Sequence, residues 1–339
     1  MRTLVVSDLH LGARLGRDVL RRPEALAALL GALEDVDRLV LLGDVVELAE
    51  HRPRFAMAAA EPVLRAIGTA MADREIVIVP GNHDRALVRP WVRATGRALA
   101  VDAAVPLDAT PGLARVAGWL APARVRACYP GLWLSGRVFA THGHYLDRHL
   151  LPEGAFGVGR GLLGRLPRDG AVPADYEQRG PSLTRFESGL LGRLPGPLAR
   201  WAEDLAERFR ATTMPRIERR MLRPGTAPLT SRLLGLQMRR AAIPALARVV
   251  HRLGVEADWV VFGHVHRCGP LPGDDREEWA GPDGTPRIAN TGCWVYERGL
   301  LHRAEPPHPY WPGGALLIED EADPVALHLL DHLSGAELS

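Results

Sequence analysis

Lysine is absent from this sequence, so all 42 of its basic residues are arginine. We attribute this absence, together with the many alanines and glycines, to a bias toward GC-rich codons rather than to function. The arginines face 40 acidic residues, which leaves a formal net charge of +2. A charge this close to neutral gives no argument for nucleic-acid binding, and we expect nucleic acid not to be a partner.

Cysteine is scarce, and long apolar runs are missing. The three cysteines, Cys128, Cys268 and Cys293, are widely spaced and odd in number, so they indicate neither a disulfide framework nor a cysteine-based zinc motif. No uncharged apolar stretch reaches the length of a membrane-spanning helix. Met1 leads straight into a predicted strand, without a basic and apolar leader. We therefore expect a cytoplasmic protein without a transmembrane segment.

Short apolar runs alternate with amphipathic segments along the 339 residues, 47% of which are hydrophobic. The runs are rich in β-branched residues, as in strands buried inside a sheet, whereas apolar residues at i, i+3, i+4 and i+7 predict helices. This alternation predicts an α/β fold with a sizeable core. We expect strands at 3–7, 38–42, 76–79, 124–128 (at an edge), 137–141, 258–262 and 287–289, a hairpin of 315–319 with 325–331, and helices at 23–33, 55–71 and 244–253.

Polar side chains follow the most apolar of these strands. The run at 76–79 ends at a Pro-Gly pair, and Asn82, His83 and Asp84 come next. Ligands and catalytic groups of open α/β sheets lie at the carboxyl ends of strands. Alone, this stretch is a polar turn. Four other predicted strands end in the same way, with Asp8 and His10, with Asp44 and Glu47, with His142 and His144, and with His264 and His266.

This constellation has the composition of a metal centre. Carboxylate and amide oxygens mixed with imidazoles suit Mn²⁺, Fe or Zn²⁺ better than Ca²⁺. There are too many ligands for one ion, but two ions about 3.5–4 Å apart with a shared carboxylate would use them all. Two divalent ions, two carboxylates and one hydroxide leave a charge of roughly +1, which favours an anionic substrate such as a phosphate ester. Such ions lower the pKa of bound water toward about 7.

The motifs D-x-H, G-D-x-x-E, G-N-H-D, H-G-H and G-H-x-H occur in this order between Asp8 and His266. In this order they resemble those of the calcineurin-like metallophosphoesterase superfamily. The resemblance implies a four-layer α/β/β/α sandwich that forms a single domain over 1–339, with the site at its edge. It also implies an enzyme that hydrolyses a phosphodiester, a pyrophosphate or a phosphomonoester through metal-bound hydroxide, with two divalent ions, manganese first and iron or zinc as alternatives.

The resemblance assigns a role to each motif residue. His83 would stabilise the transition state or protonate the leaving oxygen, and Asp84 would hold the His83 ring. We expect Glu47 to hydrogen-bond a ligand or a backbone amide rather than a metal. Three roles of His144 stay open: it supports a metal ligand, it contacts the substrate, or it is a plain surface histidine. One metal is expected on Asp8, His10 and His266, and a second on Asn82, His142 and His264, with Asp44 between them.

Several motif residues differ from those of known subfamilies, and these differences narrow the choice of subfamily. Leu48 stands where phosphoprotein phosphatases carry an arginine, and Asp84 stands where they carry glutamate, which argues against a protein phosphatase. The D-L-H-L-G opening is similar to that of UDP-2,3-diacylglucosamine pyrophosphohydrolases, but His83 and His144 replace their arginine and aspartate. Nucleases of DNA repair share G-N-H-D, yet they carry a long cap after the last motif, where this chain has only about seventy residues.

Residues 145–240 read as a helical insertion, with 17 arginines and 10 acidic residues. Its clearest helical run spans 198–209 and carries Trp201 and Phe209 on one face. The insertion is either a set of solvated helices or a lid that attracts anions. As a lid it would select a phosphorylated small-molecule or lipid-linked substrate, and peripheral membrane contact is open. A different reading is an inactive scaffold that binds a partner through this insertion.

Overall fold

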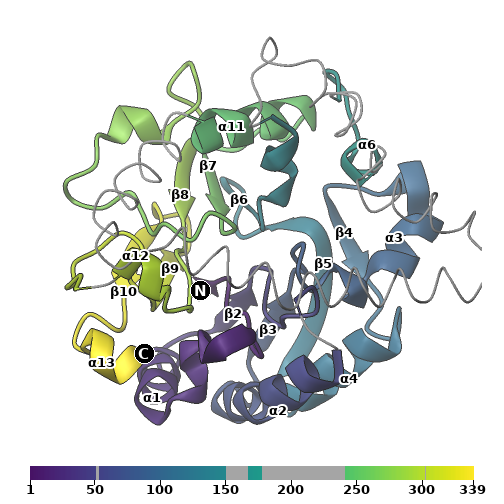
Figure 1. The fold of residues 1–339 in the computed structure, drawn as a ribbon. Helices are drawn as coiled ribbons and strands as arrows, with labels where there is room; N and C mark the ends of the chain where they lie inside the picture. The colour runs from purple at the N-terminus through teal and green to yellow at the C-terminus, as the bar shows by residue number, and fades with distance from the viewer. Residues whose placement is uncertain (51–52, 150–166, 178–240, 302) are drawn as a thin grey trace, which may run out of the picture.

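The computed structural model describes residues 1–50, 53–149, 167–177, 241–301 and 303–339 (Figure 1). Ten strands form within these residues, in one continuous pairing order, β10-β9-β1-β2-β3-β5-β6-β7-β8, with β4 also paired to β5. They are β1 Arg2–Val6, β2 Arg38–Leu41, β3 Glu75–Ile78, β4 Asp102–Val105, β5 Arg124–Trp133, β6 Val138–Thr141, β7 Trp259–Phe262, β8 Arg287–Asn290, β9 Gly314–Glu319 and β10 Val325–His328.

Strand β5 divides this order into two sheets. Its first half pairs parallel with β3, and its second half pairs antiparallel with β6. Strands β1, β2 and β3 are parallel neighbours, as are β6, β7 and β8. The strand expected at 124–128 is present, but its expected place at an edge is wrong, because β5 is the central strand that both sheets share. The structure continues the strand through Pro130, a residue whose missing N–H usually ends such a run.

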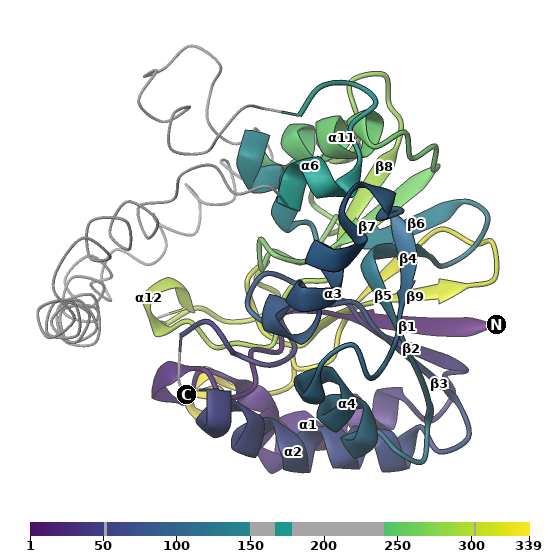
Figure 2. The same ribbon diagram turned by 90° about the vertical axis from the view of Figure 1, so that its right-hand side faces the viewer.

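Three apolar clusters show that the two sheets and their helices form four layers. Leu4 and Val6 of β1 face the helices on one side, whereas Val5 between them faces the second sheet together with Val261 of β7. Val260, the neighbour of Val261, packs on the opposite side against helix α11. This alternation follows from the two-residue period of strands. Figure 2 shows the same order, with α1, α2 and α4 along one outer face and α11 along the other. The α/β/β/α sandwich is thus confirmed.

The helices match the predicted amphipathic segments closely. Proline opens α1 and α2, where its missing N–H removes no helical hydrogen bond. Gly254, with φ +66°, lies just beyond α11, a common way for a helix to stop. The helices are α1 Pro23–Ala32, α2 Pro53–Ala70, α3 Arg89–Thr95, α4 Pro111–Trp119, α6 Pro173–Glu177, α11 Ile243–Arg252, α12 Arg298–Leu301 and α13 Gly335–Leu338, with a 3-10 helix η5 at His144–His149.

The hairpin at the end of the chain is confirmed as the antiparallel pair β9 and β10. Strand β4 and helices α3 and α4 are additions that the proline-rich region 85–136 did not reveal. Of the predicted insertion, only 145–149 and 167–177 are described, so the expected helix at 198–209 lies outside the described residues. Among the described helices, none has the length and apolar character needed to cross a membrane.

The packing between the two sheets predicts where the fold is most sensitive. Leu316 of β9 is fully buried in that layer, whereas Val325 of β10 is 55% exposed. We expect Leu316→Ala to lower the free energy of unfolding by about 2–5 kcal/mol, because it leaves a cavity. Val325→Ala should change it by less than about 0.5 kcal/mol. Urea denaturation measures both, and equal midpoints would contradict the sandwich packing.

Candidate metal centre

The loops that follow β1, β2, β3, β6 and β7 carry all of the predicted site residues. Each strand ends one to three residues before its motif, so the side chains meet at one edge of the sandwich. Three groups of ligand-type side chains result, each with its ligand atoms within 4.8 Å of one another. They are Asp8 with His10 and His266, His10 with Asp44 and His83, and Asp44 with His142 and His264.

The first group surrounds the Asp8 Oδ1 atom, which accepts no hydrogen bond from the described residues. Asp8 is fully buried, and its Oδ2 accepts from the backbone N–H of His264 at 2.9 Å. Its Oδ1 has no hydrogen-bond partner among the described residues. The Nε2 atoms of His266 and His10 lie 3.3 and 3.8 Å from that oxygen. A buried carboxylate oxygen faced by two imidazole nitrogens is a good place for a cation.

The third group converges on Asp44. His142 is fully buried, and its Nδ1 lies 2.9 Å from the carbonyl of Leu42. Because a carbonyl only accepts, this contact requires Nδ1 to carry the proton and leaves the Nε2 lone pair to point away from it. Nε2 lies 3.2 Å from Asp44 Oδ2 and 3.2 Å from Asn82 Oδ1. Three acceptors that meet in this way need a cation between them.

Asp44 also contacts His10 of the first group and the backbone of the third motif. Its Oδ2 lies 3.8 Å from His10 Nε2, and its Oδ1 accepts from the backbone N–H of His83 at 2.8 Å. Asp44 is thus the carboxylate that lies between the first group and the third.

The backbone is strained at the predicted ligands. A positive φ is uncommon for residues other than glycine and costs of order 1–3 kcal/mol where it is sparsely populated. Nine non-glycine residues in the described ranges adopt it, with five of them predicted ligands at φ between 43° and 69°. These five are Asp8, His10, Asp44, His264 and His266. Strain concentrated on these residues indicates a functional constraint on their directions.

Glu47 orients two of the imidazoles. Its Oε2 lies 2.8 Å from His10 Nδ1 and 2.7 Å from His83 Nδ1, and its Oε1 accepts from the backbone N–H of Ala49 and of Glu50. Burial alone would raise the pKa of Glu47, but its bonds to both histidines lower that pKa below its usual range. An ionised carboxylate only accepts, so both histidines carry a proton on Nδ1 and present Nε2 to the site.

The resemblance implied that Asp84 holds the His83 ring, but in the structure Asp84 has other partners. Its carboxylate accepts from the backbone N–H of Gly81 at 2.6 Å and of Val45 at 2.8 Å. Asp84 therefore ties the third motif to the loop that carries Asp44. Burial and the charge of Asp44 raise the pKa of Asp84 to about 6. The residue at the ring is Glu47, which comes from another loop, so the spacing of the third motif could not reveal it.

The site holds positive charge tightly. Burial would raise the pKa of Asp8, yet His266 and His142 lower it to about 2. Burial likewise disfavours a charged His142, but Asp44 outweighs this effect and raises the pKa of His142 to about 10. A proton on His142 therefore lies where a metal ion would place its charge. The donor set, the orphan oxygen of Asp8 and this affinity for cations all fit divalent ions.

Three side chains that the sequence did not single out also touch the predicted site residues. Asp147 of η5 lies 2.9 Å from His264 Nε2, and Ser7 donates a hydrogen bond to Asp8 Oδ2. Tyr129 contacts His144, with 3.3 Å between Oη and Nε2. None of the three belongs to a motif, so the spacing of residues in the sequence could not predict that they contact the site.

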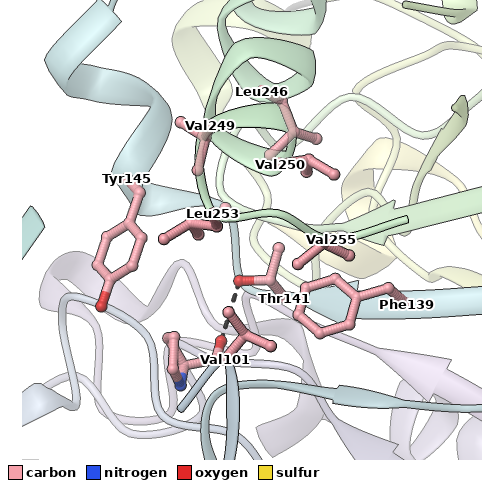
Figure 3. Close-up of a pocket in the computed structure, with 11 residues that line it drawn as sticks. Val101, Phe139, Thr141, Tyr145, Leu246, Val249, Val250, Leu253 and Val255 are labelled. Carbon is pink, nitrogen blue, oxygen red and sulfur yellow. Dashed lines mark hydrogen bonds between the residues drawn. The ribbon is translucent and has the colours of Figure 1, made fainter. Parts of the chain in front are cut away.

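Two cavities that described residues line lie elsewhere. One, of about 10 Å³, is apolar and lies between α11 and β6, where Thr141 Oγ1 donates to the carbonyl of Pro130 (Figure 3). This volume holds at most one water molecule. The other, of about 560 Å³, lies beside Asp258, at the opposite end of β7 from His264. Neither is lined by the carboxylates of the metal centre.

Close packing of glycine against the carboxylates yields a test. A Cβ atom on Gly81 would lie 2.3 Å from Asp44 Oδ1 and 2.7 Å from His142 Cδ2. We expect Gly81→Ala to displace both side chains and to lower the metal content measured by elemental analysis. In Gly118→Ala, on helix α4, the new Cβ meets nothing within 4 Å. That control should bind metal normally and be more stable by up to about 1 kcal/mol. Equal metal content in both variants would contradict this geometry.

Comparison with known proteins agrees with the chemistry of the site. No curated protein sequence matches this chain. The model of one family, described as Calcineurin-like phosphoesterase, matches residues 1–159. The match contains four of the five motifs, from Asp8 to His144, and the structure adds His264 and His266 from beyond it. The first 159 residues thus match a calcineurin-like phosphoesterase domain, and this match indicates a metal-dependent phosphoesterase.

Proposed function

We propose that the protein hydrolyses a phosphate ester at a centre of two divalent ions, with manganese the first candidate. The observation that carries this proposal is the position of Asp44, whose carboxylate lies between two separate groups of imidazoles. Asp8, His10 and His266 would hold one ion, and Asn82, His142 and His264 the other. When bound, such ions polarise a phosphoryl oxygen and acidify a water molecule.

His83 is our candidate for the group that acts on the phosphoryl oxygens. Its side chain is 26% exposed, so its Nε2 can reach a bound substrate while Nδ1 stays on Glu47. Burial lowers the pKa of His83, but the bond to Glu47 and the charge of Asp44 outweigh it and raise the pKa. A higher pKa favours the protonated ring, which can donate a proton to the leaving oxygen.

The substrate would be an anion that carries a phosphoryl group. We infer a phosphodiester, a pyrophosphate or a phosphomonoester on a small or lipid-linked molecule, chosen by the region 145–240 with its surplus arginine. The similarity of the first motif to UDP-2,3-diacylglucosamine pyrophosphohydrolases keeps nucleotide-linked pyrophosphates among the candidates. A cytoplasmic location and a peripheral membrane contact through this region are further parts of the proposal.

The bridging role of Asp44 gives a direct test of the two-ion centre. We expect the manganese-loaded protein to hydrolyse at least one member of a panel of monoesters, diesters, nucleotide-sugar pyrophosphates and nucleic acids, and to lose this activity in EDTA. Asp44→Asn removes the shared charge, so both ions should be lost together in elemental analysis. Asp35→Asn, whose side chain is 87% exposed, is the matched control. Two tightly held ions in the Asp44 variant would contradict bridging, and metal binding without any hydrolysis would favour a scaffold.

The role of His83 is separable from metal binding. His83→Ala should keep the metal content near that of the wild type while kcat falls by about 10²–10⁴-fold, the range for a lost acid-base group. His251→Ala, an exposed histidine on α11, should change neither quantity. Because His83 also lies within 4.8 Å of His10 and Asp44, loss of metal together with activity would make it a ligand instead.

A further inference from the structure

A buried carboxylate from the region 145–240 reaches the residues behind the metal centre. Glu177, the last residue of α6, has a side chain that is only 8% exposed and forms an ion pair with Arg85. Its Oε1 accepts from the hydroxyls of Tyr129 at 2.5 Å and of Tyr145 at 2.7 Å. With Arg85 beside it, Glu177 is ionised and can only accept hydrogen bonds.

Helix α6 is held against the protein body by contacts that do not involve this carboxylate. The ring of Tyr176 stacks on that of Tyr145, with 4.9 Å between centroids, and its hydroxyl lies 3.1 Å from His149 Nε2. Asp175 forms an ion pair with Arg97. Glu177 is therefore placed by an anchored helix, and its bonds to the two tyrosines are not required to dock it.

The direction of the hydrogen bonds then follows from donor and acceptor counts. Tyr129 has one proton, and the shorter contact gives it to Glu177. Its oxygen can still accept, and His144 Nε2 lies 3.3 Å from it. For this contact to be a hydrogen bond, His144 Nε2 carries the proton, because two acceptors cannot bond each other. In a neutral ring this leaves a lone pair on Nδ1.

No donor among the described residues bonds to that lone pair. His144 Nδ1 is buried and has no hydrogen-bond partner among the described residues. Its ring lies 5.6 Å from the ring of His142, one of the predicted ligands. A buried acceptor without a donor is unfavourable unless a group outside the chain completes it. At the candidate metal centre, the hydroxyl of a water molecule or of a protonated phosphate would complete it.

We propose that Glu177 and Tyr129 are positioning residues that fix the tautomer of His144, so that His144 Nδ1 accepts a hydrogen bond from a hydroxyl in the active site. The inference rests on the proposed phosphoesterase function for the identity of that hydroxyl. The chain of hydrogen bonds from Glu177 through Tyr129 to His144, which we call the relay, is a property of the folded chain and does not depend on that function. It makes α6, and hence part of the region 145–240, a contributor to the geometry of the site as well as to substrate choice.

The tautomer can be read without any activity. Histidine ¹⁵N spectra of the metal-free and zinc-loaded protein, with His144 assigned by its absence in His144→Ala, should show a proton on Nε2. In Tyr129→Phe and Glu177→Gln we expect a mixture of tautomers, because the partner that fixes Nε2–H is lost or reoriented. A proton on Nδ1 in the wild type would overturn the proposal, whether or not the protein hydrolyses any ester.

Kinetics and metal content complete the test. Both variants should retain wild-type metal content and thermal stability close to that of Tyr176→Phe, and kcat/KM should fall about three- to tenfold, as for one hydrogen bond. Tyr176→Phe removes a hydroxyl from the same helix without touching the relay and should leave kcat/KM unchanged. Loss of metal in Tyr129→Phe would show that His144 is a ligand, and an equal effect of Tyr176→Phe would reduce Glu177 to an anchor. Either result overturns the proposal.

A pair of substrates identifies the donor. A phosphomonoester carries a hydroxyl on phosphorus when it is protonated, whereas a diester has none. A loss confined to the monoester supports a substrate hydroxyl, and an equal loss on both supports water. No loss on either substrate, with the tautomer changed, would contradict a role for His144 Nδ1 in the site.

Discussion

Two buried carboxylates, Asp8 and Asp44, set the requirement that the rest of the site meets: positive charge has to reach them. Burial penalises their ionised forms, and the surrounding imidazoles, rather than lysine or arginine, supply the compensation. Imidazoles can release their protons to make room for metal ions, which a guanidinium cannot do. The strained backbone of the loops that carry the predicted ligands and the glycine at position 81 both allow these side chains to approach one another closely.

The imidazoles are in turn oriented by acceptors that hold no proton. Glu47 fixes His10 and His83, and the Leu42 carbonyl fixes His142. In each case Nδ1 carries the proton and Nε2 faces the site. His144 is the exception, since its contact with Tyr129 reverses the tautomer. The site therefore depends on the residues that hydrogen-bond to the imidazoles, because a change of tautomer turns the nitrogen that would bind a metal into a hydrogen-bond donor.

The sequence analysis succeeded where a signal was local. Strand ends, helix faces and motif spacings follow from contacts between near neighbours in the chain, and nine of the strands were expected close to their observed positions. It ended β5 too early and placed it at an edge, because Pro130 hid the second half of the strand and the pairing with both β3 and β6 is long-range. It failed again at Asp84, where the resemblance implied a contact with the His83 ring, whereas the carboxylate accepts from the backbone of Gly81 and Val45.

The sequence by itself determined which side chains follow each strand, and therefore the chemistry of the centre: carboxylates, one amide and imidazoles at strand ends. The tertiary structure alone decided which of them meet. Asp44 lies between two groups because β2 lies in one sheet and His142 and His264 follow strands of the other, and only the packing of the sheets brings these loops together. Glu47, Asp147 and Glu177 gain their partners in the same way, since a contact across loops leaves no spacing in the chain for a reader of the sequence to detect.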